Sequence, residues 1–395
     1  MSRYLLVVVP HSLCDRRRRT RPIRTAFFSR PARNAFGARA ALNATMVLAM
    51  MGCGVDRVPS TPVNLFDEAA GTVVTRRLAF DTLWVYGGAG DTIMLNADRV
   101  AAFPDGDAAV LDMFGRRVHR VGVGGVAWSW GTRGEGPGEI DHVRDLDVNA
   151  EGEVVLADSR NGRLHWLAGD GSWLREVGLP EGSINVDAVA ALGDGHYILS
   201  SLMYGTALAT LESTPPGTIA ANRWVRVSAE GEIEGLVPFP WDGFRSMSFF
   251  QTVGNIAGAR SLSASGGRRW VFGFGLGNGF FVFNDSVAEA YPYVRHADFP
   301  EVEAGGLGGG RDGFRVSYRE GRPDRVARDV AIRGDTVYVL AGNHWEIDRY
   351  ESTTGQYLDS VLLPVPLSRF ALARDALVGI VAGGMYPQVI ALRAK

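Results

Sequence analysis

The chain has 395 residues, of which 46% are apolar, so it can bury a large core and is not disordered. Its formal net charge of −2 conceals a segregation of charge, because residues 1–40 hold ten of the 41 basic residues and one of the 43 acidic ones. The remaining chain has 31 basic and 42 acidic residues. A domain this acidic repels phosphate backbones, which excludes nucleic acid as a general partner.

The basic N-terminal segment leads into an uncharged run, AALNATMVLAMMG (40–52), followed by Cys53. A positive region, a short apolar stretch and small residues before a cut are typical of a secretory signal. The run is too short to span a bilayer. Its end resembles a bacterial lipoprotein processing site, in which the cysteine is acylated. We therefore expect a signal peptide over 1–52, membrane contact only through a lipid on Cys53, and an extracytoplasmic location. A buried helix of a cytosolic domain is the alternative.

Residues 53–71 are polar with two prolines and predict a flexible tether. From residue 72 the sequence changes to short apolar runs separated by Gly, Asp and Asn, and no stretch sustains a helical period. A strand–turn–strand pattern recurs at 97–112, 143–158, 186–201, 327–342 and 367–383. Its matched positions Asp98, Arg144 and Asp187 are 46 and 43 residues apart. A four-stranded unit with this period is typical of a propeller blade.

Counting these units predicts an all-β, six-bladed propeller over 72–395. The fourth blade is degenerate, with expected strands at 248–255, 268–275, 279–285 and 288–294. Two insertions, 205–222 and 296–313, interrupt the period. The last blade lacks a strand at the C-terminus, and TLWVYGG (82–88) is left over at the N-terminal side. We expect this segment to close the ring as the outer strand of the last blade, which removes exposed sheet edges.

The glycine-rich stretch GTRGEGPGEI (131–140) has two possible roles, a phosphate-binding loop or a connection between blades. A phosphate loop would need a preceding parallel strand and a following helix, and neither is predicted. We therefore interpret it as the chain's return from the rim to the axis, where glycines supply positive φ angles.

The stretch GEGPGE before an inner strand, together with DSRNGRLHWL (158–167), resembles the NHL-type six-bladed propellers. It is especially similar to the bacterial extracytoplasmic six-bladed β-propeller lipoproteins and secreted proteins. The resemblance is strong over 90–180 and nearly absent over 205–320. It implies the fold and an extracytoplasmic location, and a binding platform rather than a defined chemistry. Related six-bladed families include calcium-dependent lactonases, whose ligand pattern is not recognisable here.

Inner strands of a propeller begin around one mouth of the axial channel, where a small ligand or metal can bind. The charged residues at these positions, besides Asp98, are Arg99, Arg144, Asp145, Asp187, Arg328, Asp329 and Arg369. Arginine and aspartate together could bind a carboxylate or a sugar. Asp145, Asp187 and Asp329 could instead hold calcium. The third possibility is that all of them form ion pairs between blades.

Other chemistry-bearing residues give weaker signals. The seven histidines show no zinc-binding spacing, and of these only His142 lies beside the predicted channel mouth. Trp128, Trp130, Trp166 and Trp173 suit packing between blades, with a sugar-stacking surface as the alternative. The sequence therefore favours a monomeric, non-catalytic binding or scaffold protein with no cofactor, whose ligand is a protein or a small carbohydrate or carboxylate. The alternative is a calcium-dependent hydrolase or lyase of the lactonase type.

Overall fold

The computed structural model describes residues 71–395 except 91–93, 95, 180–185, 194, 202–221, 239–260, 265–267, 276–278, 285–286, 296–300, 308–310 and 318–325. Every regular element within these residues is a β-strand. The predicted signal peptide, tether and Cys53 lie outside the described residues. Within the described part of the chain, no helix is long and apolar enough to cross a membrane.

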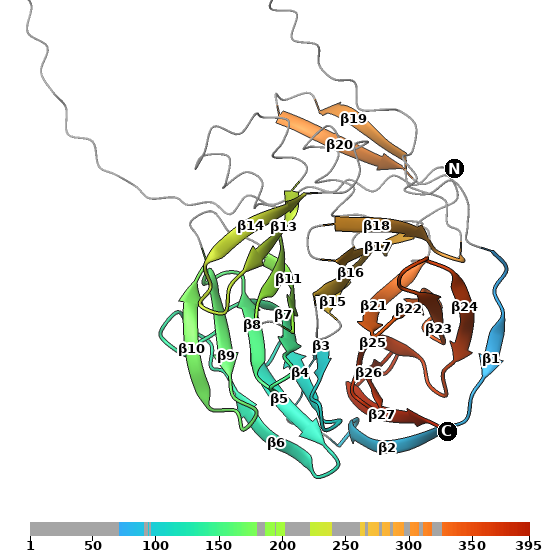
Figure 1. The fold of residues 1–395 in the computed structure, drawn as a ribbon. Helices are drawn as coiled ribbons and strands as arrows, with labels where there is room; N and C mark the ends of the chain where they lie inside the picture. Colours follow the sequence, from blue (N-terminus) through green and yellow to red (C-terminus); the bar gives the residue numbers. More distant parts are fainter. Residues whose placement is uncertain are drawn as a thin grey trace, which may run out of the picture.

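Six four-stranded antiparallel blades surround a common axis, which confirms the predicted six-bladed β-propeller (Figure 1). We name them A to F in chain order. Blade A contains β3 (Ala97–Ala102), β4 (Ala108–Asp112), β5 (Arg117–Gly122) and β6 (Gly125–Trp130). Blade B contains β7 (Val143–Val148), β8 (Val154–Asp158), β9 (Arg163–Leu167) and β10 (Trp173–Gly178). Blade C contains β11 (Val186–Ala191), β12 (Tyr197–Ser201), β13 (Asn222–Val227) and β14 (Ile233–Pro238).

The second half of the ring is built in the same way. Blade D contains β15 (Ser261–Ala264), β16 (Arg269–Gly273), β17 (Gly279–Asn284) and β18 (Val287–Pro292). Blade E contains β21 (Ala327–Arg333), β22 (Thr336–Ala341), β23 (Glu346–Glu351) and β24 (Tyr357–Leu362). Blade F contains β25 (Leu367–Leu372), β26 (Leu377–Val381), β27 (Gln388–Ala394) and, from the N-terminal side, β2 (Phe80–Gly87).

The ring closes as predicted from the segment near Trp84. Strand β2 pairs antiparallel with β27 and becomes the outer strand of blade F. An additional strand, β1 (Thr75–Arg77), pairs in parallel with β24 at the outer edge of blade E. The chain entering the ring therefore covers the edges of two neighbouring blades, E and F, along the rim in Figure 1. Covered edges offer no unpaired backbone groups to other chains.

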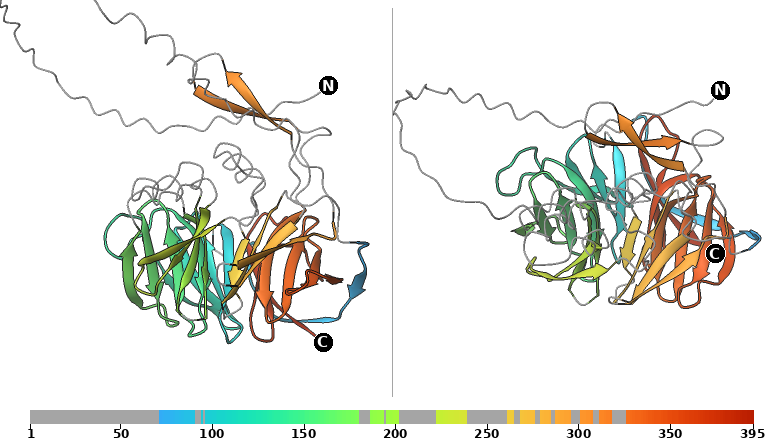
Figure 2. Two further views of the ribbon diagram at one scale, coloured as in Figure 1. Left: turned by 45° about the horizontal axis from the view of Figure 1, so that its top comes forward. Right: turned by 90° about the horizontal axis from the view of Figure 1, so that it is seen from above.

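Blade D differs from the prediction in its inner strand. The four strands are present, but the inner one is the short β15, whereas the predicted 248–255 lies outside the described residues. A hairpin of β19 (Glu301–Leu307) and β20 (Arg311–Ser317) overlaps the insertion predicted after this blade, 296–313, and extends beyond it. The hairpin forms its own two-stranded sheet and lies outside the ring of blades (Figures 1 and 2).

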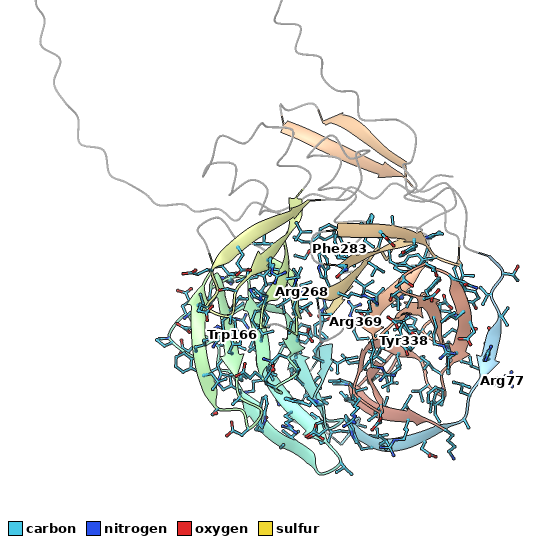
Figure 3. All side chains as sticks on the ribbon, viewed as in Figure 1. Arg77, Trp166, Arg268, Phe283, Tyr338 and Arg369 are labelled. Carbon is cyan, nitrogen blue, oxygen red and sulfur yellow. The ribbon has the colours of Figure 1, made fainter. Side chains whose placement is uncertain are left out.

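Buried strands and aromatic side chains hold the blades against one another. The second strands β4 and β8 are buried along their whole length, because both faces of the blade pack on neighbours. Their continuous apolar sequences follow from this burial. Large rings fill several of the interfaces, as for Trp166 and Phe283 in Figure 3. Trp166 is fully buried, contacts Tyr197 of blade C edge to face, and donates a 2.7 Å hydrogen bond to its hydroxyl.

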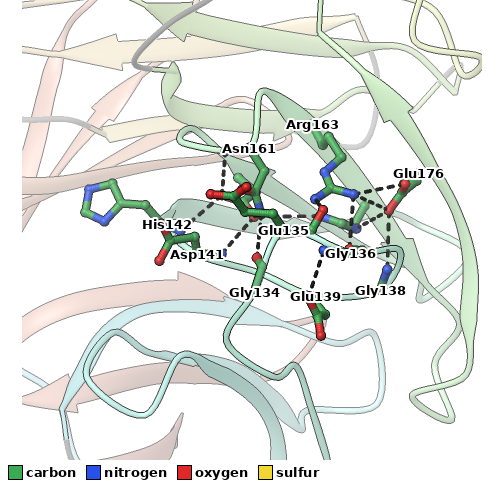
Figure 4. A network of polar contacts seen from close by, with 12 residues as sticks. Gly134, Glu135, Gly136, Gly138, Glu139, Asp141, His142, Asn161, Arg163 and Glu176 are labelled. Carbon is green, nitrogen blue, oxygen red and sulfur yellow. Dashed lines mark hydrogen bonds and ion pairs between the residues drawn. The ribbon is translucent and has the colours of Figure 1, made fainter. Parts of the chain in front are cut away.

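The glycine-rich loop connects β6 to β7, as predicted, and side chains of blade B hold it in place (Figure 4). The amide of Asn161 donates to the carbonyl of Gly134 at 3.0 Å. The guanidinium of Arg163 donates to the carbonyls of Glu135 and Gly136, at 2.6 and 3.2 Å. The stretches GEGPGE and DSRNGR, which together resemble NHL-type propellers, are thus the two halves of one contact.

A buried aspartate anchors the start of the inner strand in blade B. Asp158 is fully buried and accepts the backbone N–H groups of Asp141 and His142, both at 3.1 Å, and the side-chain amide of Asn161 at 2.8 Å. Asp112 ends the second strand of blade A and accepts the N–H of Asn96 in the same way. Asp112 and Asp158, which occupy equivalent positions in the sequence repeat, therefore each hold the backbone just before the inner strand of their blade.

Candidate functional site

A cavity of about 430 Å³ lies on the axis of the propeller. Its wall comes from inner strands, chiefly β3, β7, β21 and β25, with Ala191 of β11 and Ala264 of β15. At one end lie the first lining residues of those four strands, and at the other the turns that follow them, including Pro104, Asn149 and Arg374. The cavity is therefore the predicted axial channel, and Arg369 is labelled beside the axis in Figure 3.

A β-bulge recurs near the start of the inner strands and places the charged residues of the channel. The register shifts at the second residue in β3, β7, β11, β21 and β25. A bulge leaves one residue unpaired and re-aims the side chains around it. The residues directly after the bulge are Arg99, Asp145, Asp329 and Arg369 in four of these strands, and all four line the cavity.

On one side of the channel, carboxylates of blade B connect three blades. The Nε of Arg99 in blade A lies 3.3 Å from Oδ1 of Asp145. The other oxygen of Asp145 accepts the backbone N–H of Val189 in blade C at 3.0 Å. Asp147, two residues further along the same face of the strand, accepts the N–H of Ala191 at 2.8 Å. These contacts tie adjacent inner strands together at the axis.

The opposite side of the channel repeats the arrangement between blades E and F. Oδ2 of Asp329 accepts the N–H of Phe370 at 2.9 Å. In return, Nη1 of Arg369 donates to the carbonyl of Arg328 at 2.6 Å. The predicted alternative was ion pairs between blades. The Arg99–Asp145 pair is of this kind, whereas Asp329 and Arg369 contact backbone groups of the neighbouring blade. All four residues also line the cavity, so the ligand alternative stays open.

Burial changes the acidity of the channel carboxylates. It raises the pKa of Asp145 to about 7, although Arg99 and the Val189 amide favour the ionised form. It also raises the pKa of Asp147 to about 6, against the hydrogen bonds from Ala191 and Val148. The channel therefore loses negative charge as the pH falls from 7 to 5, while its arginines stay protonated.

The remaining predicted site residues whose side chains the structure describes are not among those that line the axial cavity. Arg144 and Arg328 occupy the bulge position itself and are not among the residues that line the cavity. Asp98 also lies at a bulge, and its carboxylate pairs with Nη1 of Arg99 at 2.6 Å. The side chain of Asp187 lies outside those that the structure describes.

The predicted calcium set can be compared with these contacts. Each carboxylate oxygen of Asp145 and Asp329 faces an N–H group or a guanidinium. Calcium needs six to eight oxygen ligands. Among the described residues no group of three His, Cys, Asp or Glu side chains could hold a metal ion. Asp145 and Asp329 alone do not fit a calcium site, and the full set with Asp187 stays a prediction.

Three further charged residues line the channel that the sequence did not single out: Asp147, Arg333 and Arg374. Strand alternation could have indicated Asp147, because it lies two residues after Asp145. Arg333 ends β21 and donates to the carbonyls of Ala373 and Arg374. Arg374 lies in the turn after β25, and Arg333 is the last residue of its strand, so the repeat pattern did not place either side chain.

The histidine and tryptophans singled out in the sequence lie away from this cavity. Burial and the nearby Arg144 lower the pKa of His142. The indole of Trp128 donates to the carbonyl of Gly169 across the interface between blades A and B. Trp173 is 44% exposed on the outer strand of blade B. Packing between blades accounts for Trp128 and for the buried Trp166.

Comparisons with known proteins support the architecture only. No family model matches the chain, and no curated protein matches it. A solved structure from Bacteroides fragilis, described as an exported protein, has a TM-score of 0.50 and 12% identity, and the match covers 82% of this chain and 100% of that one. A member of the DUF4221 family from Bacteroides vulgatus has a TM-score of 0.49 and 10% identity, with 80% and 98% covered. Virginiamycin B lyase from Staphylococcus aureus has a TM-score of 0.45 and 10% identity, with 75% and 80% covered. The likeness to the Bacteroides fragilis structure concerns the fold alone, and the β-propeller itself follows from the strand topology of this chain.

Proposed function

We propose that the chain is an extracytoplasmic, non-catalytic binding propeller that takes a small carboxylate-bearing ligand, such as an organic acid or an acidic sugar, in its axial channel. The observation that carries the proposal is the charge of the lining. Four arginines line the cavity: Arg99, Arg333, Arg369 and Arg374. The three acids that line it accept backbone N–H groups of the inner strands, and the pKa of two of them is raised.

The cavity has the size and chemistry for such a ligand. About 430 Å³ lies within the range of small-molecule sites. A guanidinium can present paired N–H donors to a carboxylate, and such charge-assisted hydrogen bonds are stronger than neutral ones. Proton uptake by Asp145 and Asp147 would lower repulsion, so the affinity should increase from pH 8 to pH 6.

The test is calorimetry or thermal shift of the purified chain with succinate, citrate, galacturonate, glucose and succinamide. We expect the charged ligands to raise the melting temperature and the neutral ones to have no effect. Arg369→Ala should weaken binding at least tenfold, because a charged hydrogen bond contributes about 1.5–3 kcal/mol. Arg117→Ala, which removes an exposed arginine of blade A, is the matched control.

Equal binding of glucose and galacturonate, or an unchanged affinity in Arg369→Ala, would remove the carboxylate proposal. A calcium-dependent melting shift that a chelator reverses would favour the lactonase-type alternative. The location is tested separately, by mass spectrometry of the mature N-terminus in a bacterial host. We expect an acylated Cys53, and an unmodified or retained Cys53 contradicts the lipid anchor.

A further inference from the structure

A second cavity, of about 630 Å³, lies between blades E and F. Strands β22 to β24 form one wall and β25 to β27 the other. The segment between β1 and β2 crosses the rim and contributes Leu78 and Phe80. Although Arg333, Leu372 and Arg374 border both cavities, most of the lining is separate from the axial channel.

Large buried rings join several of the other blade interfaces. Blades B and C meet through Trp166 and Tyr197, with ring centroids 5.4 Å apart. Blades C and D meet through Trp224, which contacts three rings of blade D at 4.9 to 5.5 Å. Blades D and E meet through Phe280 and Tyr350. Blades E and F pack chiefly through aliphatic side chains, with the partly buried rings of Phe80 and Tyr338 against the same cluster.

The walls of the cavity are apolar. Aliphatic side chains come from both blades, and the largest described ring of blade E in the wall is Tyr338, labelled in Figure 3. The apolar lining consists of Leu78, Phe80, Tyr338, Ile347, Val361, Leu363, Leu372, Ala376, Leu377, Leu392 and Ala394. Five charged residues, Arg374 and Arg393 among them, also line the cavity, so its occupant needs a polar as well as an apolar part. An aliphatic chain fits this lining.

Arginines lie around the apolar lining, in excess of acids. Arg349 is neutralised by Asp359, with bidentate contacts at 2.6 and 2.7 Å. Arg333 donates to two carbonyls and lies over the ring of Tyr338 at 5.8 Å. Within the described part of the chain, neither Arg374 nor Arg393 has an ion-pair or hydrogen-bond partner for its guanidinium. Asp375 is the only acid in the lining, so the local charge is positive.

We propose that this cavity binds an anionic amphiphile, with a single aliphatic chain between the blades and its anionic head group at Arg374 and Arg393. The apolar walls select the chain, and the uncompensated arginines select the charge. The site goes beyond the proposed carboxylate site in the channel, because Arg393 and Ala394 line only this cavity. A fatty acid and an acidic phospholipid share this chemistry, and the experiment separates them.

The test measures displacement of a fluorescent fatty acid from the purified full chain by dodecanoate, with dodecanol as the uncharged ligand of equal length. We expect dodecanoate to compete at least tenfold better than dodecanol. The double variant Arg374→Ala/Arg393→Ala should weaken dodecanoate at least tenfold, and Ala394→Trp should block it by filling the exposed mouth. Arg117→Ala should bind as the parent does, and melting curves establish that each variant is folded.

The source of the ligand is identified by co-sedimentation with phosphatidylglycerol vesicles and with phosphatidylcholine vesicles. Sedimentation with the anionic vesicles only, lost in the double variant, assigns the head group to a membrane lipid. Displacement by free dodecanoate without vesicle binding assigns a free fatty acid. The proposal is overturned if dodecanol competes as well as dodecanoate, or if the folded double variant binds dodecanoate with the affinity of the parent. It is also overturned if neither dodecanoate nor the vesicles bind. If Arg369→Ala loses succinate or citrate binding, that result tests the proposed carboxylate site in the channel and says nothing about the cavity between blades E and F.

Discussion

The interface between blades B and C and the interface between blades E and F join the same kind of four-stranded sheets in different ways. Trp166 fills the first, with its indole hydrogen-bonded to Tyr197 and the guanidinium of Arg175 at 4.5 Å over its ring. The second has aliphatic walls and a cavity of about 630 Å³. Buried rings therefore fill the B–C interface, whereas the E–F interface keeps a cavity beside the partly buried rings of Phe80 and Tyr338.

The largest contrast is expected from removing one ring at each interface. Trp166→Ala should lower the free energy of unfolding by about 3–5 kcal/mol, because the indole is fully buried and its loss leaves a void. Tyr338→Ala should cost about 1–2 kcal/mol, because that ring is only partly buried beside an existing cavity. Urea unfolding of both variants measures the difference. Equal losses would mean that the E–F wedge is as tightly packed as the B–C wedge.

A second contrast concerns the buried polar group that organises blade B. Asp158→Ala should cost about 2–4 kcal/mol, because it leaves buried N–H groups of Asp141 and His142 without an acceptor. The neighbouring His165 ring and these amides outweigh burial and hold the pKa of Asp158 below its usual value. Asp170→Ala, at an exposed turn of the same blade, is the control and should cost much less than Asp158→Ala in the same unfolding assay. A cost for Asp158→Ala no larger than that of the control would contradict the anchoring role.

The sequence predicted a blade well where its strands follow the regular pattern, and poorly where the inner strand is short or polar. Blades A and B could be predicted from the sequence because their second strands are continuous apolar runs. Each of these strands ends at an aspartate, Asp112 in blade A and Asp158 in blade B. Blade D misled the prediction because its inner strand, SLSA (261–264), is short and half polar. The edge strand β1 gave no signal, since a three-residue exposed strand depends on its partner β24 rather than on its own sequence.

The candidate site was predictable in position but not in detail. The repeat placed Arg99, Asp145, Asp329 and Arg369 near the axis, and these four line the cavity. Which residues face the channel depends on the β-bulge, and a shift of one position exchanges the faces of a strand. The E–F cavity could not be predicted, because its walls come from segments that are brought together only by the fold.

The smallest effect we predict concerns the titration of the blade B carboxylates in the axial channel. Burial raises the pKa of Asp145 to about 7, well above the unfolded value of about 3.9. Between about pH 4 and pH 7 the folded protein therefore holds a proton that the unfolded chain has lost, and this contribution to stability disappears as the pH rises through 7. Asp147 acts in the same direction up to about pH 6. The lowered pKa of His142 acts in the opposite direction below pH 6.5 and is common to parent and variant.

Asp145→Asn removes one titration while keeping an acceptor for the Val189 N–H. Relative to the parent, the variant should gain about 1–3 kcal/mol of unfolding free energy between pH 4.5 and pH 7.5, because each unit of pKa shift corresponds to about 1.4 kcal/mol. Urea unfolding at four pH values measures this difference directly. Asp170→Asn is the control, since the hydrogen bonds of Ser172 lower the pKa of that exposed carboxyl and place its effect at lower pH. Parallel pH profiles for the parent and Asp145→Asn would show that Asp145 is ionised in the folded channel throughout this range, and the channel would then keep its negative charge at the pH where we expect acidic ligands to bind best.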